Sequence, residues 1–274
     1  MCLPLQTASS IKTESTALRK AVLRNDTQTA RSLVEDEQGA HLICQPDYTG
    51  YTPISTAFIQ NHVPLAEHFI QRLLDIKYTE TDILYQCFLY RHGNGKTILH
   101  FAATMVDEAL ADKCITVCAK LLADVPDAVE QILRALDRNG NTAFHLAAAH
   151  GNKGNLISLF HAAAKLNDKK LINTLLRQCN WQGNNLLMCA TSGLAQGAWR
   201  PAPKGCSDVV DWLLAYVSPF SIYDSALLTA KWQSVPVCCV WTAFATSALD
   251  EAHRVSFLRS LCNLTGACTG FDLT

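Results

Sequence analysis

The sequence lacks the features of a nucleic-acid-binding, secreted or membrane-spanning protein. Its 23 lysines and arginines are balanced by 24 aspartates and glutamates, for a formal net charge of −1. No basic excess is therefore available to neutralise phosphates. Residues 1–12 contain no basic start followed by an apolar run, so no secretory signal peptide is visible. The most apolar stretch, 235–245, is too short to cross a bilayer. We expect a soluble cytoplasmic protein with no nucleic-acid partner and no membrane span.

The sequence also lacks recognisable catalytic and cofactor motifs. HExxH, GxSxG, phosphate-loop and GxGxxG patterns are absent, and no CxxC pair indicates a zinc or thiol-redox site. Most of the 12 cysteines lie in apolar helical segments, as Cys114 and Cys118 do. Buried free cysteine behaves as a small hydrophobic residue, and this usage fits a reducing compartment. We expect no metal, no cofactor, no small-molecule ligand and no catalytic residue.

What the sequence does contain is one motif that occurs three times. A glycine, any residue and a threonine are followed by an apolar stretch rich in alanine, beginning at Gly50, Gly95 and Gly140. The spacing is constant, because 95 − 50 = 45 and 140 − 95 = 45. A looser copy begins at Gly183, with asparagine in place of threonine. A fixed period indicates stacked units that build an extended binding surface.

The copy around Gly140 predicts a local structure for each unit. Asp137 opens a turn in which Gly140 supplies a positive φ, and Thr142 caps the helix that follows. His145 is expected to point along the stack and bridge to the adjacent turn. A second helix is expected to begin near Lys153, with an apolar stripe at helical spacing.

These residues resemble the ankyrin repeat, which is a turn followed by two antiparallel helices. The fourth unit matches best, with Asp137, Gly140, Thr142, Phe144, His145, Ala147, Ala148 and Gly151 in register. The resemblance implies an all-α, ankyrin-like repeat solenoid, with units starting near 47, 92, 137 and 180. It also implies that His100 and His145 are structural, which we favour over a metal-binding or acid–base role.

The period departs from the family, since ankyrin units are about 33 residues long. The surplus falls before each turn, in the segments 81–90, 127–136 and 167–176, which have helical apolar spacing. We therefore predict an extra short helix in several repeats. An armadillo-like three-helix array is the rival architecture, but the repeated motif favours the ankyrin-like one.

The chain divides into four parts on this interpretation. Residues 1–12 are expected to be a flexible N-terminus, and 13–45 an N-terminal capping helix pair. Residues 46–192 form the core repeats. Residues 193–274 are expected to hold degenerate repeats, with a long loop at 194–205 and a helix over 207–216.

Function is expected at the turn tips, the side chains that the turns present around their glycines. Tyrosine, tryptophan and arginine are enriched at binding hot spots, and an exposed tryptophan needs a partner to cover it. The alternative for Trp181 is packing beneath the loop that contains Trp199. The predicted partner-binding residues are Tyr48, Tyr51, His92, Asn94, Lys96, Arg138, Asn139, Asn141, Trp181, Gln182 and Asn184.

The sequence therefore predicts a non-catalytic scaffold that binds a protein partner through the concave face and turn tips of the array. Drifted ankyrin arrays of this kind resemble those of effectors that intracellular bacteria deliver into host cells, which implies a host protein as partner and the host cytosol as location. The alternative is a targeting module of an enzyme whose catalytic domain lies in 193–274 or outside this chain. Cys206 is the candidate nucleophile there, because it lies just before an expected helix start.

Overall fold

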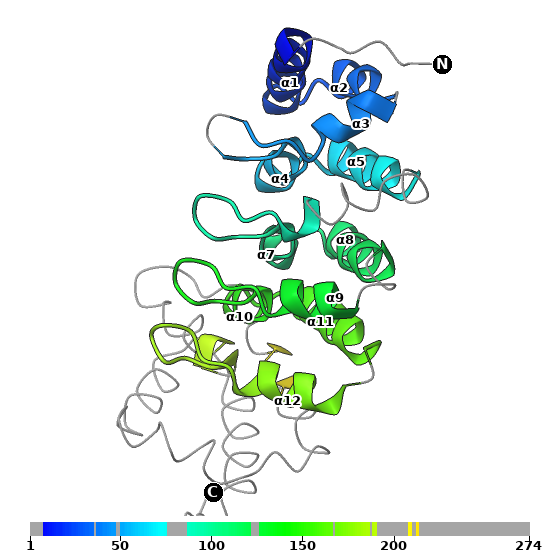
Figure 1. Ribbon diagram of the computed structural model, residues 1–274. Helices are drawn as coiled ribbons and strands as arrows, with labels where there is room; N and C mark the ends of the chain where they lie inside the picture. The colour runs from blue at the N-terminus through cyan, green and yellow to red at the C-terminus, as the bar shows by residue number, and fades with distance from the viewer. Residues whose placement is uncertain are drawn as a thin grey trace, which may run out of the picture.

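The computed structural model describes residues 8–35, 37–47, 50–75, 87–121, 126–166, 168–186, 188–190, 208–209 and 212–213. Within these residues the regular structure is helical and no strand is formed, which confirms the all-α prediction. None of their helices combines the length and the apolar character needed to cross a bilayer. The helices stack in chain order along one axis, as Figure 1 shows.

The first unit consists of α1 (Ala8–Leu23), α2 (Thr27–Leu33) and α3 (Glu37–Leu42). Asp26 caps α2 by accepting a hydrogen bond from the Thr29 N–H. The prediction of a flexible segment over 1–12 is wrong for residues 8–12, which belong to α1. The reason is that no glycine or proline interrupts the chain between Ala8 and Leu23, so the helix extends toward the N-terminus.

The next three units each begin with a short helix followed by a longer one. The pairs are α4 (Pro53–Ile59) with α5 (Val63–Asp75), α7 (Ile98–Thr104) with α8 (Glu108–Leu121), and α10 (Ala143–Ala149) with α11 (Lys153–Ala164). The alanines Ala102, Ala103, Ala147 and Ala148 are buried. Their small side chains let α7 and α10 pack directly against each other.

The predicted extra helix is present in the third and fourth units. It is α9 (Pro126–Leu133) in the third and α12 (Lys169–Arg177) in the fourth. Each buries an apolar face, with Val129 and Ile132 in α9 and Leu171 and Leu175 in α12 all within the core. For the second unit, most of the predicted segment 81–90 lies outside the described residues. Its residues 87–89 are described, and they are helical.

Four tight turns precede the repeated motif, and they confirm the ankyrin-like prediction. We call them the second turn (47–51), third turn (92–96), fourth turn (137–141) and fifth turn (180–184), after the units that they open. In each, the glycine N–H donates to the carbonyl three residues earlier: Gly50 to Asp47, Gly95 to His92, Gly140 to Asp137 and Gly183 to Asn180. The four glycines have φ between +74° and +83°, a conformation that other residues adopt at a cost.

A threonine precedes the first helix of the second, third and fourth units. Thr52, Thr97 and Thr142 have extended backbone conformations and precede α4, α7 and α10. In the second unit the hydroxyl of Ser55 accepts the Thr52 N–H at 3.1 Å. In the third and fourth units a histidine takes the place of that serine.

The C-terminal part of the chain, predicted as degenerate repeats over 193–274, lies almost entirely outside the described residues. The four positions described there fall within the helix predicted over 207–216. Val209 and Leu213 are buried in the core, and the Trp212 ring lies 5.6 Å from that of Phe160. These contacts place an apolar face against the fourth unit, while the loop at 194–205 stays a prediction.

Candidate functional site

Two buried histidines, His100 and His145, bond to backbone carbonyls further along the array. The Nδ1 atom of His100 accepts the Thr97 N–H at 3.1 Å, so its Nε2 carries the ring proton and donates to the Asn141 carbonyl at 3.0 Å. His145 makes the equivalent bridge to the Gln178 carbonyl at 3.1 Å. Burial lowers the pKa of both imidazoles to about 4, which keeps them neutral near pH 7. With both ring nitrogens engaged, these residues are structural, as the sequence predicts.

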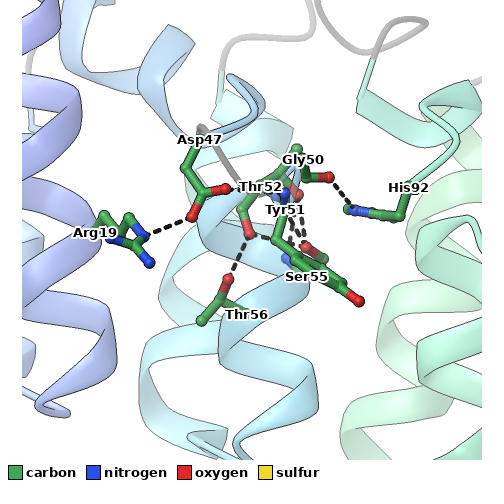
Figure 2. A network of polar contacts seen from close by, with 8 residues as sticks. All are labelled: Arg19, Asp47, Gly50, Tyr51, Thr52, Ser55, Thr56 and His92. Carbon is green, nitrogen blue, oxygen red and sulfur yellow. Dashed lines mark hydrogen bonds and ion pairs between the residues drawn. The ribbon is translucent and has the colours of Figure 1, made fainter. Parts of the chain in front are cut away.

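The second turn is fixed from the N-terminal side by an ion pair. Arg19 of α1 places its Nε 2.5 Å from an Asp47 carboxylate oxygen, and the other oxygen accepts the Tyr51 N–H at 3.1 Å. Figure 2 shows this carboxylate between the arginine and its own turn. The described part of the first unit begins directly with α1, which supplies this contact to the second turn.

Aromatic rings bury the junction between the second and third turns. The His92 ring stacks on Tyr51 at a centroid distance of 5.3 Å and meets the edges of Tyr90 and Phe101 at 4.9 and 5.1 Å. Its Nδ1 donates to the Gly50 carbonyl at 3.0 Å, as seen in Figure 2. This aromatic junction is packed rather than open to a partner.

The prediction that His92 is a partner-binding residue is therefore wrong. Its side chain is only 4% exposed, and burial lowers its pKa. The physical reason is its place at the first position of the turn, which Asp47, Asp137 and Asn180 occupy in the other units. A side chain at this position folds inward and bonds to the backbone instead of pointing away from the core.

Hydrogen bonds join the third, fourth and fifth turns into a ladder. The Arg138 N–H donates to the Asn94 carbonyl at 2.9 Å, and the Trp181 N–H donates to the Asn139 carbonyl at 3.0 Å. Within the fourth turn, one Asp137 carboxylate oxygen accepts the N–H of Asn139 at 2.8 Å and that of Asn141 at 2.9 Å. These bonds hold the backbones of adjacent turns in fixed positions.

Side-chain amides strengthen the same ladder. The Asn180 Nδ2 donates to the Asn141 Oδ1 at 2.8 Å, across the fourth and fifth turns. The Asn180 Oδ1 accepts the backbone N–H groups of Gln182 and Asn184 at 3.1 and 2.9 Å. Asn180 thus replaces the aspartate of the second and fourth turns and gains a donor toward its neighbour.

Trp181 is the most exposed tryptophan of the described residues, at 71%. Its ring lies against the backbone of Gly140, so close that a Cβ at Gly140 would sit 2.8 Å from the indole Cγ. The indole therefore rests on the preceding turn with most of its surface facing solvent. The alternative of packing beneath the Trp199 loop concerns residues outside those described.

The predicted site residues fall into four groups by exposure. The exposed ones are Arg138, Asn139, Trp181 and Gln182; the half-buried ones are Tyr51, Asn94, Lys96, Asn141 and Asn184; His92 is buried; and Tyr48 lies outside the described residues. The four exposed residues all belong to the fourth and fifth turns. The structure thus concentrates the exposed part of the predicted set on two adjacent turns.

Two exposed arginines beside the turns were missed from the sequence. Arg91 directly precedes the third turn and donates from Nη1 to the Leu136 carbonyl at 3.2 Å. Arg177 ends α12, three positions before the fifth turn. A comparison of the residues just before each turn would have found Arg177, since Arg134 lies at the same position, three residues before the fourth turn.

The extra helix α9 borders a pocket of about 570 Å³. Its lining includes Arg91, Asp127, Glu130 and Arg134, and the last two are paired at 2.8 Å. Small-molecule sites are lined mostly by apolar side chains, with a few polar groups that fix orientation. Four of the eight residues that line this pocket are charged, which departs from that pattern.

The described cysteines are free thiols, and most of them are buried. Burial raises the pKa of Cys114 and Cys118, and it raises that of Cys189 to about 12. A raised pKa suppresses the thiolate, which is the reactive form. Among the described residues no group of three or more histidine, cysteine or acidic side chains is placed to hold a metal ion. Cys206 lies outside the described residues.

Comparison with known proteins supports the architecture. No family model and no curated protein matches the chain. Among solved structures, it is similar to the crystal structure of EF0377, an ankyrin repeat protein, with a TM-score of 0.50 and 17% sequence identity. The match covers 73% of this chain and 81% of that one. Together with the four turns and the capped helix pairs, this similarity shows that the chain has the ankyrin-repeat fold.

Proposed function

We propose that the chain is a non-catalytic scaffold that binds a partner protein through the tips of its fourth and fifth turns. The observation that carries the proposal is the exposed Trp181 ring, held on a hydrogen-bonded ladder beside Arg138. Tryptophan and arginine are the side chains most enriched at binding hot spots. Leaving an indole in water has a cost that a partner would remove.

The rigidity of the ladder favours binding. The backbones of three turns are bonded to one another, and the inward side chains of Asp137 and Asn180 fix the geometry of two of them. A surface that is ordered before binding loses little conformational freedom in the complex. The exposed side chains can therefore differ from those of other arrays without disturbing the scaffold.

A pair of alanine variants tests the proposal. Replacing Trp181 and Arg138 by alanine should abolish capture of the partner, because both are exposed and neither side chain holds the core. Thermal unfolding should be nearly unchanged. A matched control replaces Val106 and Lys120, an exposed apolar and an exposed basic residue away from the turns, and should leave capture intact. Equal loss of capture and of thermal stability in the first variant would contradict the proposal.

The resemblance to bacterial effectors narrows the range of candidate partners. On that resemblance we propose a host protein as partner and the host cytosol as the place of action. Lysates of a eukaryotic host cell and of a bacterium should be compared with the same bait. Capture that depends on Trp181 from the bacterial lysate alone would contradict this narrower proposal.

The part of the enzyme hypothesis that places catalysis within this chain depends on Cys206. An ordinary rate of Cys206 alkylation near neutral pH would remove the support for a catalytic thiol in this chain. A rate raised well above that of a free thiol would favour the enzyme hypothesis over the scaffold.

A further inference from the structure

The acidic and basic side chains of the turns point in different directions, the acidic ones inward and the basic ones toward solvent. The four turns contain only two carboxylates, Asp47 and Asp137. Both are turned inward, with the Asp47 side chain 11% exposed and Asp137 5% exposed. Asp47 is bonded to Arg19 and its own turn, and Asp137 to the N–H groups of its own turn. The Asp47 carboxylate is paired with Arg19, and the Asp137 carboxylate is turned away from the surface that the turns present.

The positive side chains of the turns are placed differently. Arg138 is exposed, and Lys96 is half-buried with its Nζ 5.9 Å from the centre of the Phe101 ring. Among the described residues, neither is paired with a carboxylate. The exposed Arg91 and Arg177 flank the third and fifth turns. The row of turns is thus basic, although the whole chain carries a formal net charge of −1.

An apolar anchor lies within this basic row. Trp181 follows Arg138 along the ladder, one turn further on, and its indole rests on Gly140 of the same turn as Arg138. A ligand that lies across these two turns therefore meets a positive charge and an exposed aromatic ring together. The half-buried amides of Asn94 and Asn184 border it and offer neutral hydrogen-bonding groups.

We infer that the surface formed by Lys96, Arg138 and Trp181 binds an acidic protein segment that carries an apolar residue. This inference rests on the proposed scaffold function and adds the chemistry of the partner. Carboxylates of the segment complement the two unpaired bases, and the apolar residue covers the indole. A nucleic acid is less favoured, because neutralising a phosphate chain requires more bases than the turns provide.

Synthetic peptides provide a direct test with the full chain. Three peptides of equal length, acidic, neutral and basic, each carry a central leucine, and a second acidic peptide carries serine instead. Fluorescence anisotropy should show the acidic leucine peptide binding about tenfold or more tightly than the other three. Raising the salt concentration should weaken it. Equal affinity for the acidic and neutral peptides would overturn the inference, as would tighter binding of a single-stranded oligonucleotide.

Charge reversal locates the effect on the turns. Lys96→Glu combined with Arg138→Glu should abolish binding of the acidic peptide and create binding of the basic one. Lys113→Glu combined with Lys120→Glu makes the same change of net charge on α8 and should leave the affinity unchanged. An equal loss in both variants would overturn the inference, because it would reflect overall charge alone.

The peptide-binding test can fail while the proposed scaffold function holds. If alanine at Trp181 and Arg138 abolishes partner capture while the acidic peptide does not bind, the scaffold function stands and the acidic chemistry is wrong. If neither the alanine nor the charge-reversal variant affects capture, the site itself is wrong.

Discussion

The row of turns is built differently at its two ends. Between the second and third turns, the rings of Tyr51, Tyr90, His92 and Phe101 fill the junction and exclude a partner. From the third turn to the fifth, backbone and amide hydrogen bonds make the junctions and leave Arg138 and Trp181 exposed. The same turn geometry therefore forms a packed junction between the second and third turns and an exposed surface on the fourth and fifth turns.

The difference follows from the first position of each turn. A histidine there reaches back to the preceding turn, as the contact from His92 to the Gly50 carbonyl shows. Asp137 and Asn180 accept N–H groups from their own turns, and Asn180 also donates to Asn141 of the fourth turn. The residues that follow them, Arg138 and Trp181, face solvent.

The largest expected effect is a loss of stability in acid. The folded pKa of His100 and His145 is about 4, below the ordinary value of 6.5, so the unfolded chain binds protons first. Their contribution is complete above about pH 6.5 and is lost as the pH falls toward 4. Together they should lower the free energy of unfolding by roughly 5 kcal/mol between about pH 7 and pH 4.5. Urea unfolding at a series of pH values measures this loss.

Amide hydrogen exchange resolves the acid effect along the array. Thr97 and Thr142 donate their N–H groups to imidazole nitrogens, whereas Thr52 donates to the hydroxyl of Ser55, which does not titrate in this range. Protection of the first two should fall with pH relative to the third. Uniform loss of protection at all three amides would show that the two histidines are not the cause of the acid effect.

The next effect concerns the glycines of the turns. A Cβ at Gly140 would lie 2.7 Å from the backbone nitrogen of Trp181. The nearest atom to a Cβ at Gly50 is the Tyr90 hydroxyl oxygen, 3.9 Å away. Both glycines have positive φ. Gly140→Ala should therefore cost about 3 kcal/mol and Gly50→Ala about 1 kcal/mol, measured by denaturant unfolding. Equal losses would show that the fourth and fifth turns are not packed as closely as described.

A smaller effect is expected at the aromatic junction. His92→Ala removes the ring stacked on Tyr51 and the donor to the Gly50 carbonyl. The free energy of unfolding should fall by about 2 kcal/mol, since a buried ring and a buried hydrogen bond are both lost. Denaturant unfolding measures it, and a variant as stable as the parent would show that the junction is open.

Much of the scaffold was predictable because it depends on local chemistry. The glycines Gly50, Gly95 and Gly140 mark the turns, and the extra helices were found from apolar spacing. The bridging role of His145 followed from its place in the motif, and the structure confirms it. Such features require only neighbouring residues, so the sequence is sufficient.

The remaining features depend on contacts between units. The burial of the His92 ring also depends on its packing against Tyr51 of the preceding turn and Phe101 of α7, which no local pattern specifies. The early start of α1 at Ala8 was missed because its first residues lack a strong apolar pattern. The basic residues beside the turns become a group only when the units are stacked.

On the proposed function, stability and binding are divided between the two ends of the row of turns. Trp181→Ala should change the free energy of unfolding by less than about 0.5 kcal/mol, since the ring is 71% exposed. The most direct test compares Trp181→Ala with His92→Ala in one experiment, measuring the melting temperature and the affinity for the captured partner. We predict that the tryptophan variant loses affinity and keeps its melting temperature, while the histidine variant melts lower and keeps its affinity. The reverse pattern, or equal changes in both variants, would contradict the account.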